Sequence, residues 1–164
     1  MVRNITAAGT TGSATLTRVR SRGMRKMTEQ EWRAFVMEGT RTAKVATARE
    51  DGRPHVVPVW FVLDGEDVVF TTSAMSVKGA ALQRDRYACL CVDDQTPPFS
   101  FVMVEGPVEL SSDLDELRRV ATRIGSRYMG DDRAEEFGAR NAAEGELLVR
   151  LRPMHVLAEA HLTD

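Results

Sequence analysis

Apolar and polar residues alternate along much of this chain of 164 residues, and the apolar runs end at turn-forming dipeptides. Asp51-Gly52 and Asp64-Gly65 are the clearest, and Asp-Gly between two apolar runs is typical of a hairpin. We therefore expect mainly antiparallel strands joined by tight turns. The predicted strands are 42–49, 54–63, 68–72, 87–92, 99–110 with a bend at Gly106-Pro107, and 147–157 with an extension to 162 left open.

Helical patterns interrupt the strand pattern. Thr28 and Glu31 have the spacing of a capping box, in which each side chain binds the other residue's backbone N–H. The longest helix should begin at Ser112, because apolar residues then recur at helical spacing. The predicted helices are 28–37, 74–84, 112–128 and 133–141. These elements together predict an α+β fold, an antiparallel barrel of about six strands with peripheral helices.

Residues 1–27 differ from the rest because they are rich in Gly, Ser and Thr and contain no acidic residue. We expect a disordered or flexible tail there, followed by one domain over 28–164. Three other interpretations stay open for the tail. It could contain the true translation start, at Met24 or Met27, it could be a transit peptide, or it could fold over an anionic ligand.

The net charge of -2 gives no reason to expect nucleic acid or an anionic membrane as a partner. The chain has no apolar run of about 20 residues, so we expect no membrane span and place the protein in the cytoplasm. Cys89 and Cys91 should share one face of a strand as small, buried side chains, with metal or redox chemistry as the alternative. The histidines are not spaced as a metal set, and we predict no metal site.

A polar turn is the first candidate for chemistry, because phosphate-binding glycine motifs and hydrolase motifs are missing from the sequence. Thr71, Thr72, Ser76 and Lys78 fall within eight residues at the start of a predicted helix. Hydroxyls, a lysine and the unpaired amides of a first helical turn together suit a phosphate.

The strand before this turn is the second candidate. Pro58 cannot donate a backbone hydrogen bond, so we expect it at the edge of a sheet or beside something other than a strand. A flat ring lying against that backbone would fit, and Trp60 should be on the same strand face as Pro58. Arg127 and Tyr128 end the longest helix, where they reach a partner's site, pack in the core or interact with the dipole at the C-terminal end of the helix.

Four segments carry a family resemblance: V-A-T-A-R-E-D-G-R-P-H-V-V-P-V-W-F at 45–61, T-T at 71–72, S-V-K at 76–78 with Leu82, and V-R-L-R-P at 149–153. Over roughly 28–162 the chain resembles the pyridoxamine 5'-phosphate oxidase-like, FMN-binding split-barrel family. It is most similar to the actinobacterial branch that uses coenzyme F420. It departs from the family at Ala81, where Asn is frequent, and at Arg86, where Pro is frequent.

The resemblance implies a homodimer of split β-barrels with two cofactor sites at the subunit interface. It implies that one group of residues lies along the cofactor ring and that a second group surrounds the phosphate. The first group is Val57, Pro58, Val59 and Trp60, and the second is Thr71, Thr72, Ser76, Val77 and Lys78. We assign no catalytic residue.

The choice of cofactor depends on charge. The turn has one lysine, whereas FMN-binding relatives tend to have more than one cation there, so we predict coenzyme F420 and keep FMN as the alternative. The acidic tail of the deazaflavin needs a basic track, for which the candidates are Lys44, Arg53, Arg84, Arg86 and the arginine-rich N-terminal tail.

The predicted activity is hydride transfer between the deazaflavin and a small, electron-poor organic substrate that the sequence does not identify. An FMN-dependent oxidase or flavin reductase is the first alternative. A non-catalytic protein that binds a flavin, a deazaflavin or haem is the second.

Overall fold

A computed structural model describes residues 24–163 of the chain. The tail predicted over 1–27 therefore lies mostly outside the described residues. The strands are β1 (Arg25–Lys26), β2 (Ala43–Ala48), β3 (Pro54–Val59), β4 (Val62–Asp64), β5 (Asp67–Ser73), β6 (Tyr87–Asp94), β7 (Ser100–Ser111), β8 (Glu146–Leu151) and β9 (His155–Ala160). The helices are α1 (Glu29–Met37), α2 (Val77–Asp85), α3 (Leu114–Met129) and α4 (Ala134–Asn141), with a short 3-10 turn at Asp131–Arg133.

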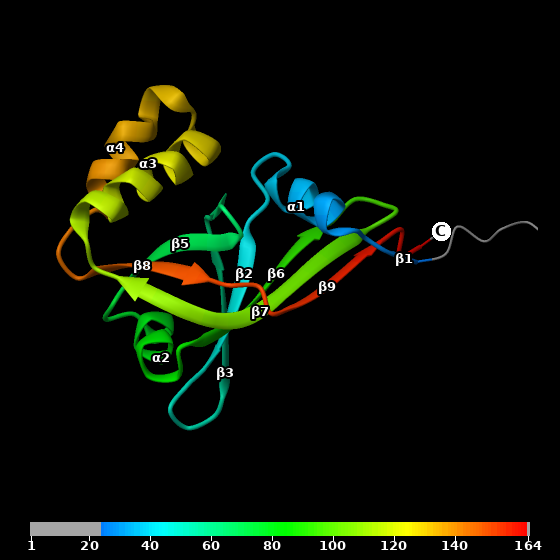
Figure 1. Ribbon diagram of the computed structural model, residues 1–164, viewed down its shortest axis with the longest axis horizontal. Coiled ribbons are helices and arrows are strands. Elements are labelled where there is room, and N and C mark those ends of the chain that lie inside the picture. Colours follow the sequence, from blue (N-terminus) through cyan, green and yellow to red (C-terminus); the bar gives the residue numbers. More distant parts are fainter. Residues whose placement is uncertain (1–23, 164) are drawn as a thin grey trace, which may run out of the picture.

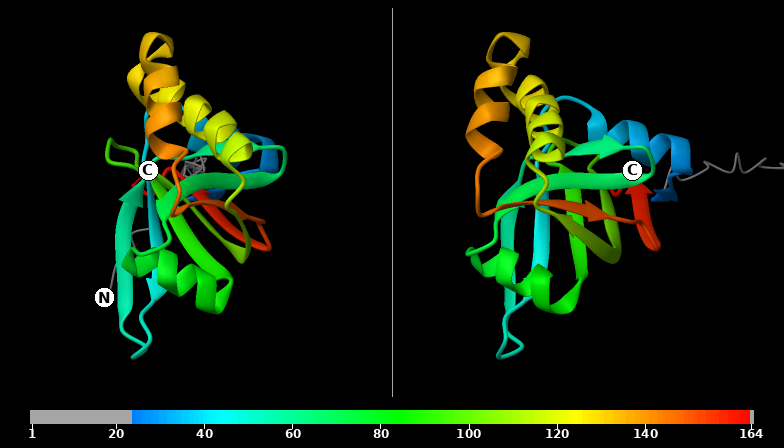
Figure 2. Two further views of the ribbon diagram at one scale, coloured as in Figure 1. Left: turned by 90° about the vertical axis from the view of Figure 1, so that its left-hand side faces the viewer. Right: turned by 60° about the vertical axis from the view of Figure 1, so that its left-hand side comes forward.

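The strands form one antiparallel sheet in the order β3-β2-β6-β7-β8-β5-β4, and β9 pairs with both β7 and β1. The sheet curls into a half-barrel, with α3 and α4 side by side at one end (Figures 1 and 2). In Figure 1, α2 lies on the opposite side of the sheet from α3, and α1 lies above β6 and β7. The predicted α+β class and its antiparallel barrel are confirmed.

Two long predicted strands are wrong, because each is two strands in the structure. The segment 54–63 breaks at Trp60 and Phe61, since β3 pairs with β2 whereas β4 pairs with β5. The segment 147–157 breaks around Pro153, since β8 pairs with β5 and with residues 108–111 of β7, whereas β9 pairs with residues 100–105 of β7 and with β1. At the first break the chain changes its partner strand, and at the second it leaves β5 and continues along β7, which local alternation does not reveal.

The helix starts follow their local signals closely. Both hydrogen bonds of the predicted capping box are present, at Thr28 and Glu31. The longest helix is capped by Asp113 and not by Ser112, and the Asp113 carboxylate accepts a bond from the backbone N–H of Glu116 at 2.8 Å. The strand β1, paired with β9, precedes the expected start of the domain at Thr28.

The core has two parts. One part fills the inside of the curled sheet, where Trp32 and Val36 of α1 pack against the strands. The other lies between α3 and the strands β4, β5 and β8, and includes Val69, Leu117 and Leu148. Since α3 covers these strands, its C-terminal end is held above the connection between β3 and β4. Among the described residues, no helix is long and apolar enough to cross a bilayer.

Candidate functional site

Two of the strand edges that lack a neighbour in the described sheet meet at the connection between β3 and β4. β3 pairs only with β2, and β4 pairs only with residues 67–69 of β5. One edge of β5 is therefore unpaired over residues 70–73. The chain runs from β3 into β4 through Trp60 and Phe61, so the two edges begin near each other at these residues. We call residues 57–60 and 70–73 the split, and residues 60–61 the corner.

The predicted ring-binding residues lie on the β3 edge of the split. Val57 is half-buried, Pro58 is exposed and Val59 is buried. The prediction that Pro58 lies at a sheet edge is confirmed, because β3 is the terminal strand of the sheet order. The edge thus offers backbone and small apolar side chains, a surface on which a flat ring can lie.

Trp60 lies just beyond the end of β3 and is 37% exposed. Its indole stacks on the ring of Tyr128, with centroids 4.9 Å apart and planes within 3°. Phe137 of α4 contacts the same indole at 5.8 Å and 47°. Helices α3 and α4 therefore determine the orientation of Trp60, although they are remote from it in sequence.

Arg127 and Tyr128 bind the backbone of this same chain. The Arg127 guanidinium donates to the carbonyl oxygens of Phe61 and Val36, both at 2.8 Å. The Tyr128 hydroxyl donates to the Arg41 carbonyl at 2.7 Å and accepts from the Phe61 N–H at 3.4 Å. Burial lowers the pKa of Arg127 and raises the pKa of Tyr128. The end of α3 thus fixes the corner.

The second predicted group lies where β5 ends and α2 begins. Thr72 is 4% exposed, and its hydroxyl lies 3.1 Å from that of Ser76. The Ser76 hydroxyl donates to the Ser73 carbonyl at 2.8 Å and accepts from the Gly79 N–H at 3.0 Å, which makes Ser76 the N-cap of α2. Thr71 alternates with Thr72 and lies on the other face of β5.

The first turn of α2 has the features of an anion site. Val77 is exposed and Lys78 is partly exposed. Their amides are in the first helical turn, where N–H groups have no partner within the helix. One cation and two amides are thus available at residues 77–78.

A carboxylate accompanies this lysine. Glu146 pairs with Ser73 in the sheet, and the Ala74 N–H donates to the Gly145 carbonyl at 2.8 Å. Burial raises the pKa of Glu146, and the charge of Lys78 opposes that rise. Sequence reasoning missed Glu146, because only the sheet register brings it to the turn. The Glu146 carboxylate therefore lies near enough to Lys78 for the two charges to interact.

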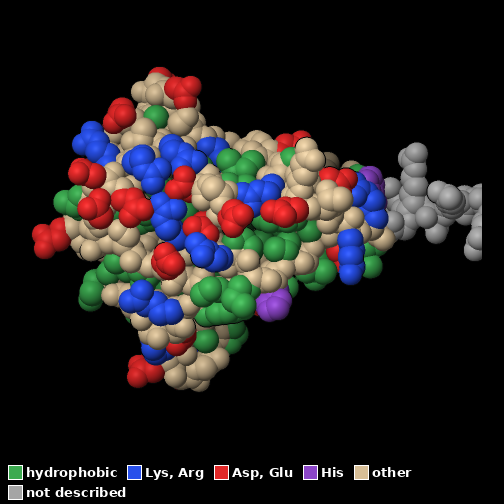
Figure 3. Space-filling model, in the orientation of Figure 1, with side chains coloured by type: hydrophobic (Ala, Val, Ile, Leu, Met, Phe, Trp, Pro, Cys, Tyr) green, Lys and Arg blue, Asp and Glu red, His purple; other side chains and the backbone are tan. Residues whose placement is uncertain are grey.

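The predicted basic track is largely balanced by aspartates. Lys44 pairs with Asp93, and Arg84 pairs with Asp85 at 2.6 Å. Arg53 pairs with Asp51 at 2.8 Å, whereas Arg86 donates to the Gln83 carbonyl at 3.3 Å. Cations and anions are also interspersed over the face shown in Figure 3.

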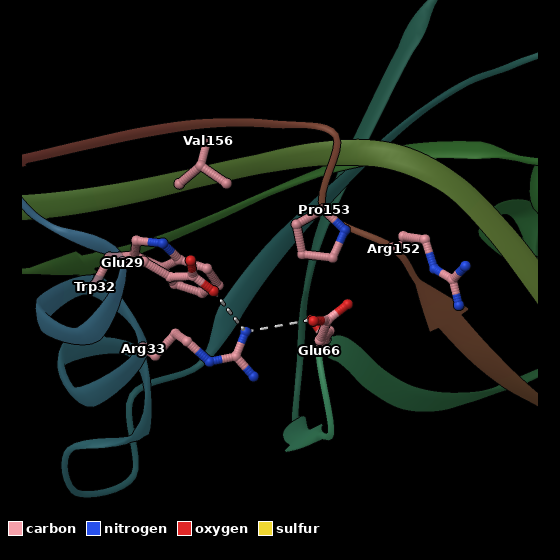
Figure 4. A pocket seen from close by; sticks show the side chains of 7 residues that line it. All are labelled: Glu29, Trp32, Arg33, Glu66, Arg152, Pro153 and Val156. Atoms are coloured by element: carbon pink, nitrogen blue, oxygen red, sulfur yellow. Dashed lines mark hydrogen bonds and ion pairs between the residues drawn. The ribbon is translucent and has the colours of Figure 1, made fainter.

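A separate hollow of about 300 Å³ lies away from the split. Its lining comes from the start of α1, the turn between β4 and β5, and the segment around Pro153 (Figure 4). Arg33 extends across it between Glu29 and Glu66. None of the nine predicted cofactor-binding residues lines this hollow. In the described residues, no cluster of three or more His, Cys, Asp or Glu side chains is arranged to hold a metal ion.

A curled antiparallel sheet with an open split, an apolar edge and a helix-capped polar turn defines a split-barrel protein. The family model for pyridoxamine 5'-phosphate oxidase matches residues 28–158, and the chain belongs to this family. The family includes oxidoreductases that bind flavins or deazaflavins. No curated protein matches the chain.

Solved structures give the same fold. A conserved hypothetical protein from Mycobacterium tuberculosis is 26% identical, with a TM-score of 0.72 over 82% of this chain and 86% of that one. An F420 reductase is 24% identical, with a TM-score of 0.58 over 75% of this chain and 94% of its own. HutZ, the haem storage protein from Vibrio cholerae, is 18% identical, with a TM-score of 0.64 over 81% and 95%. At these identities the last two show the fold alone.

Proposed function

We propose that this protein is an oxidoreductase that binds coenzyme F420 in the split and transfers a hydride between it and a small, electron-poor organic molecule. One observation carries the proposal: the split combines an apolar strand edge that has no neighbouring strand with a capped turn that has one lysine. When bound, the deazaflavin would supply the hydride chemistry. The protein would orient the ring along residues 57–60 and hold the phosphate at residues 71–78.

The charge of the turn supports the deazaflavin over FMN. The phosphate of FMN is a monoester, and such a group carries about 1.5 to 2 negative charges at neutral pH. The phosphate of coenzyme F420 is a diester with a single charge. A turn in which the Glu146 carboxylate lies near Lys78 suits a singly charged group better. The balanced cations at Lys44, Arg53 and Arg84 do not add support for the acidic tail.

The proposed assembly is a homodimer in which a second copy covers one face of the sheet. Residues directly opposite each other in antiparallel strands share a face. One such row crosses five strands and consists of Pro58, Lys44, Cys91, Met103 and Leu157. Val56, at 59% exposed, lies on the same face. Lys44 is the only charged member of the row, which favours an apolar contact with a second copy of this chain.

Titration of the purified full chain with coenzyme F420 and with FMN, followed by fluorescence, tests the proposal. We expect F420 to bind in the micromolar range and more tightly than FMN at neutral pH. Reduced F420 should then be consumed with at least one member of a panel of quinones, enones and nitroaromatics. Sedimentation measures the dimer. The proposal fails if neither coenzyme binds, and tighter binding of FMN favours an FMN enzyme on the same fold.

The charge explanation has its own test, Glu146→Gln. Removing the carboxylate should strengthen FMN binding about fivefold, or about 1 kcal/mol, because the doubly charged phosphate gains most. Binding of F420 should change about twofold or less. Glu144→Gln in the preceding loop is the matched control. Equal effects on both coenzymes would contradict the charge explanation and leave the fold argument untouched.

A further inference from the structure

Tyr128 contacts the predicted coenzyme-binding edge with both ends of its side chain. Its ring lies parallel to the Trp60 indole at 4.9 Å, an offset-stacking distance. Its hydroxyl lies between the Arg41 carbonyl, at 2.7 Å, and the Phe61 N–H, at 3.4 Å. A single residue of α3 thereby fixes the plane of one corner residue and the backbone of the next.

Tyr128 is firmly anchored because its hydroxyl binds backbone atoms, which cannot rotate away as side chains can. The hydroxyl is half-buried, and burial raises its pKa, so it stays protonated and donates to Arg41 at neutral pH. The adjacent Arg127 guanidinium holds the Phe61 carbonyl at 2.8 Å and packs over the ring of Tyr128 at 4.9 Å. The corner is therefore hydrogen-bonded to α3 through both the N–H and the carbonyl of Phe61.

We propose that Tyr128 is a positioning residue for the coenzyme: its ring sets the plane of the Trp60 indole, and its hydroxyl sets the corner from which the β3 edge diverges. The inference rests on the proposed function, because it takes Trp60 as a residue that lies along the coenzyme ring. An indole that is already oriented loses little freedom when a flat ring binds beside it. Tyr128 then favours coenzyme binding without touching the coenzyme.

The emission of Trp60 provides a readout that a purely structural role would leave unchanged. The chain has two tryptophans, and Trp32 is buried in the core. Subtracting the spectrum of Trp60→Phe, which keeps Trp32, isolates the emission of Trp60. Its quenching at saturating coenzyme depends on the relative placement of the two ring systems, and not on how much of the protein is bound.

The experiment compares Tyr128→Phe, which keeps the stacked ring, with Tyr128→Leu and Tyr128→Met, which remove it. We expect Tyr128→Phe, which loses the bonds of the hydroxyl to the corner, to weaken coenzyme binding about threefold, with the same quenching of Trp60 at saturation because the stacked ring remains. The Leu and Met variants should weaken binding about tenfold and should lower the quenching of Trp60. Two such variants are used so that one well-folded example, confirmed by thermal unfolding, is enough.

Leu117→Val is the matched control, because it loosens the packing of α3 on the sheet and takes no part in the Trp60–Tyr128 stack or in the Tyr128 hydrogen bonds. Its quenching at saturation should equal that of wild type. If the folded Leu or Met variant also quenches like wild type, Tyr128 does not position Trp60 and the inference is overturned. If wild-type protein binds no coenzyme, the proposed function itself fails, and the two failures are therefore distinguishable.

Discussion

The two ends of the split are built in different ways. At the corner, Phe61 is held by Arg127 and Tyr128, which are 66 and 67 residues away in the sequence. At the turn, Ser76 is held by bonds to Ser73 and Gly79, each three residues away. The corner therefore depends on tertiary packing of α3, whereas the turn forms from its own neighbours. Substitutions at the corner should lower global stability, and those at the turn should act mainly on the ligand and on one helix.

Arg127→Ala should have the largest effect. The guanidinium is half-buried and its partners include the carbonyls of Val36, Gly39 and Phe61, all of which would lose a charged donor. We expect a loss of about 3 kcal/mol in the free energy of unfolding, measured by urea denaturation. Arg118→Ala, which breaks only an exposed pair with Glu135, should cost less than about 0.5 kcal/mol. A loss below about 1 kcal/mol for Arg127→Ala would contradict the tertiary role of the corner.

Lys78→Ala tests the turn end through the ligand. It should weaken coenzyme binding by about 1.5–3 kcal/mol, the scale of a charge-assisted hydrogen bond, with little change in stability. The phosphate-free deazariboflavin should bind both proteins equally. Arg53→Ala removes an exposed cation from the β2–β3 hairpin and is the control. Unchanged affinity in Lys78→Ala would remove Lys78 from the site.

Acid should weaken the ion pairs that join the end of β4 to α3 and β8. The Asp64 carboxylate binds Arg123 at 2.6 Å and Arg150 at 2.8 Å, which lowers the pKa of Asp64 to about 2. Because the pKa of Asp64 is lower in the folded protein than in the unfolded chain, where it is about 4, the carboxylate stabilises the fold at pH values above about 4. This stability is lost as the pH falls toward 2. The contribution is about 2 kcal/mol, and Asp64→Asn should remove it at pH 7 but cost little near pH 2. Chemical denaturation at both pH values measures this, and an equal cost at both would contradict it.

Ser76→Ala has the smallest main effect expected among these four tests, and it acts on one helix. Loss of the N-cap of α2 should cost about 1 kcal/mol in the free energy of unfolding. Ser73→Ala, whose hydroxyl accepts one bond from Met75 at 3.3 Å, should cost less. If Ser76→Ala destabilised the protein as much as Arg127→Ala, the distinction between a local turn and a tertiary corner would be wrong.

The difference between local contacts and tertiary contacts also explains which features the sequence could predict. The capping box at Thr28, the hairpin at Asp51-Gly52 and the polar turn before a short helix depend on neighbours within four residues, and the structure has all three, although this helix begins at Val77 and not at Ala74. The break at Trp60 depends on which strands pair, so alternation alone predicted one long strand. Asp113 displaced Ser112 as the cap of α3 because both residue types can cap a helix.

The residues of the candidate site also fall into those that local sequence predicted and those that only tertiary contacts bring together. The β3 edge and the turn were predicted from local residues and a family resemblance, and their roles stay predictions. Glu146 was not expected at the turn, and for Arg127 and Tyr128 the sequence did not identify the backbone of the corner as the partner, because the sheet register and the packing of α3 bring these residues there. An Arg-Tyr pair at a helix end is common and has no specific signature in one sequence.

The way in which α3 holds the corner has a consequence for sequence variation. Arg127 and Tyr128 bind carbonyls and one N–H of the backbone, which every residue type except proline supplies in the same form. These bonds therefore place no demand on the side chains at 36, 39, 41 and 61, of which Val36 and Phe61 are held by core packing instead, whereas positions 127 and 128 are fixed by the bonds themselves. Among homologues that share this corner, we therefore expect Arg127 and Tyr128 to be retained. We expect no paired substitutions between these two positions and the residues whose backbone they bind.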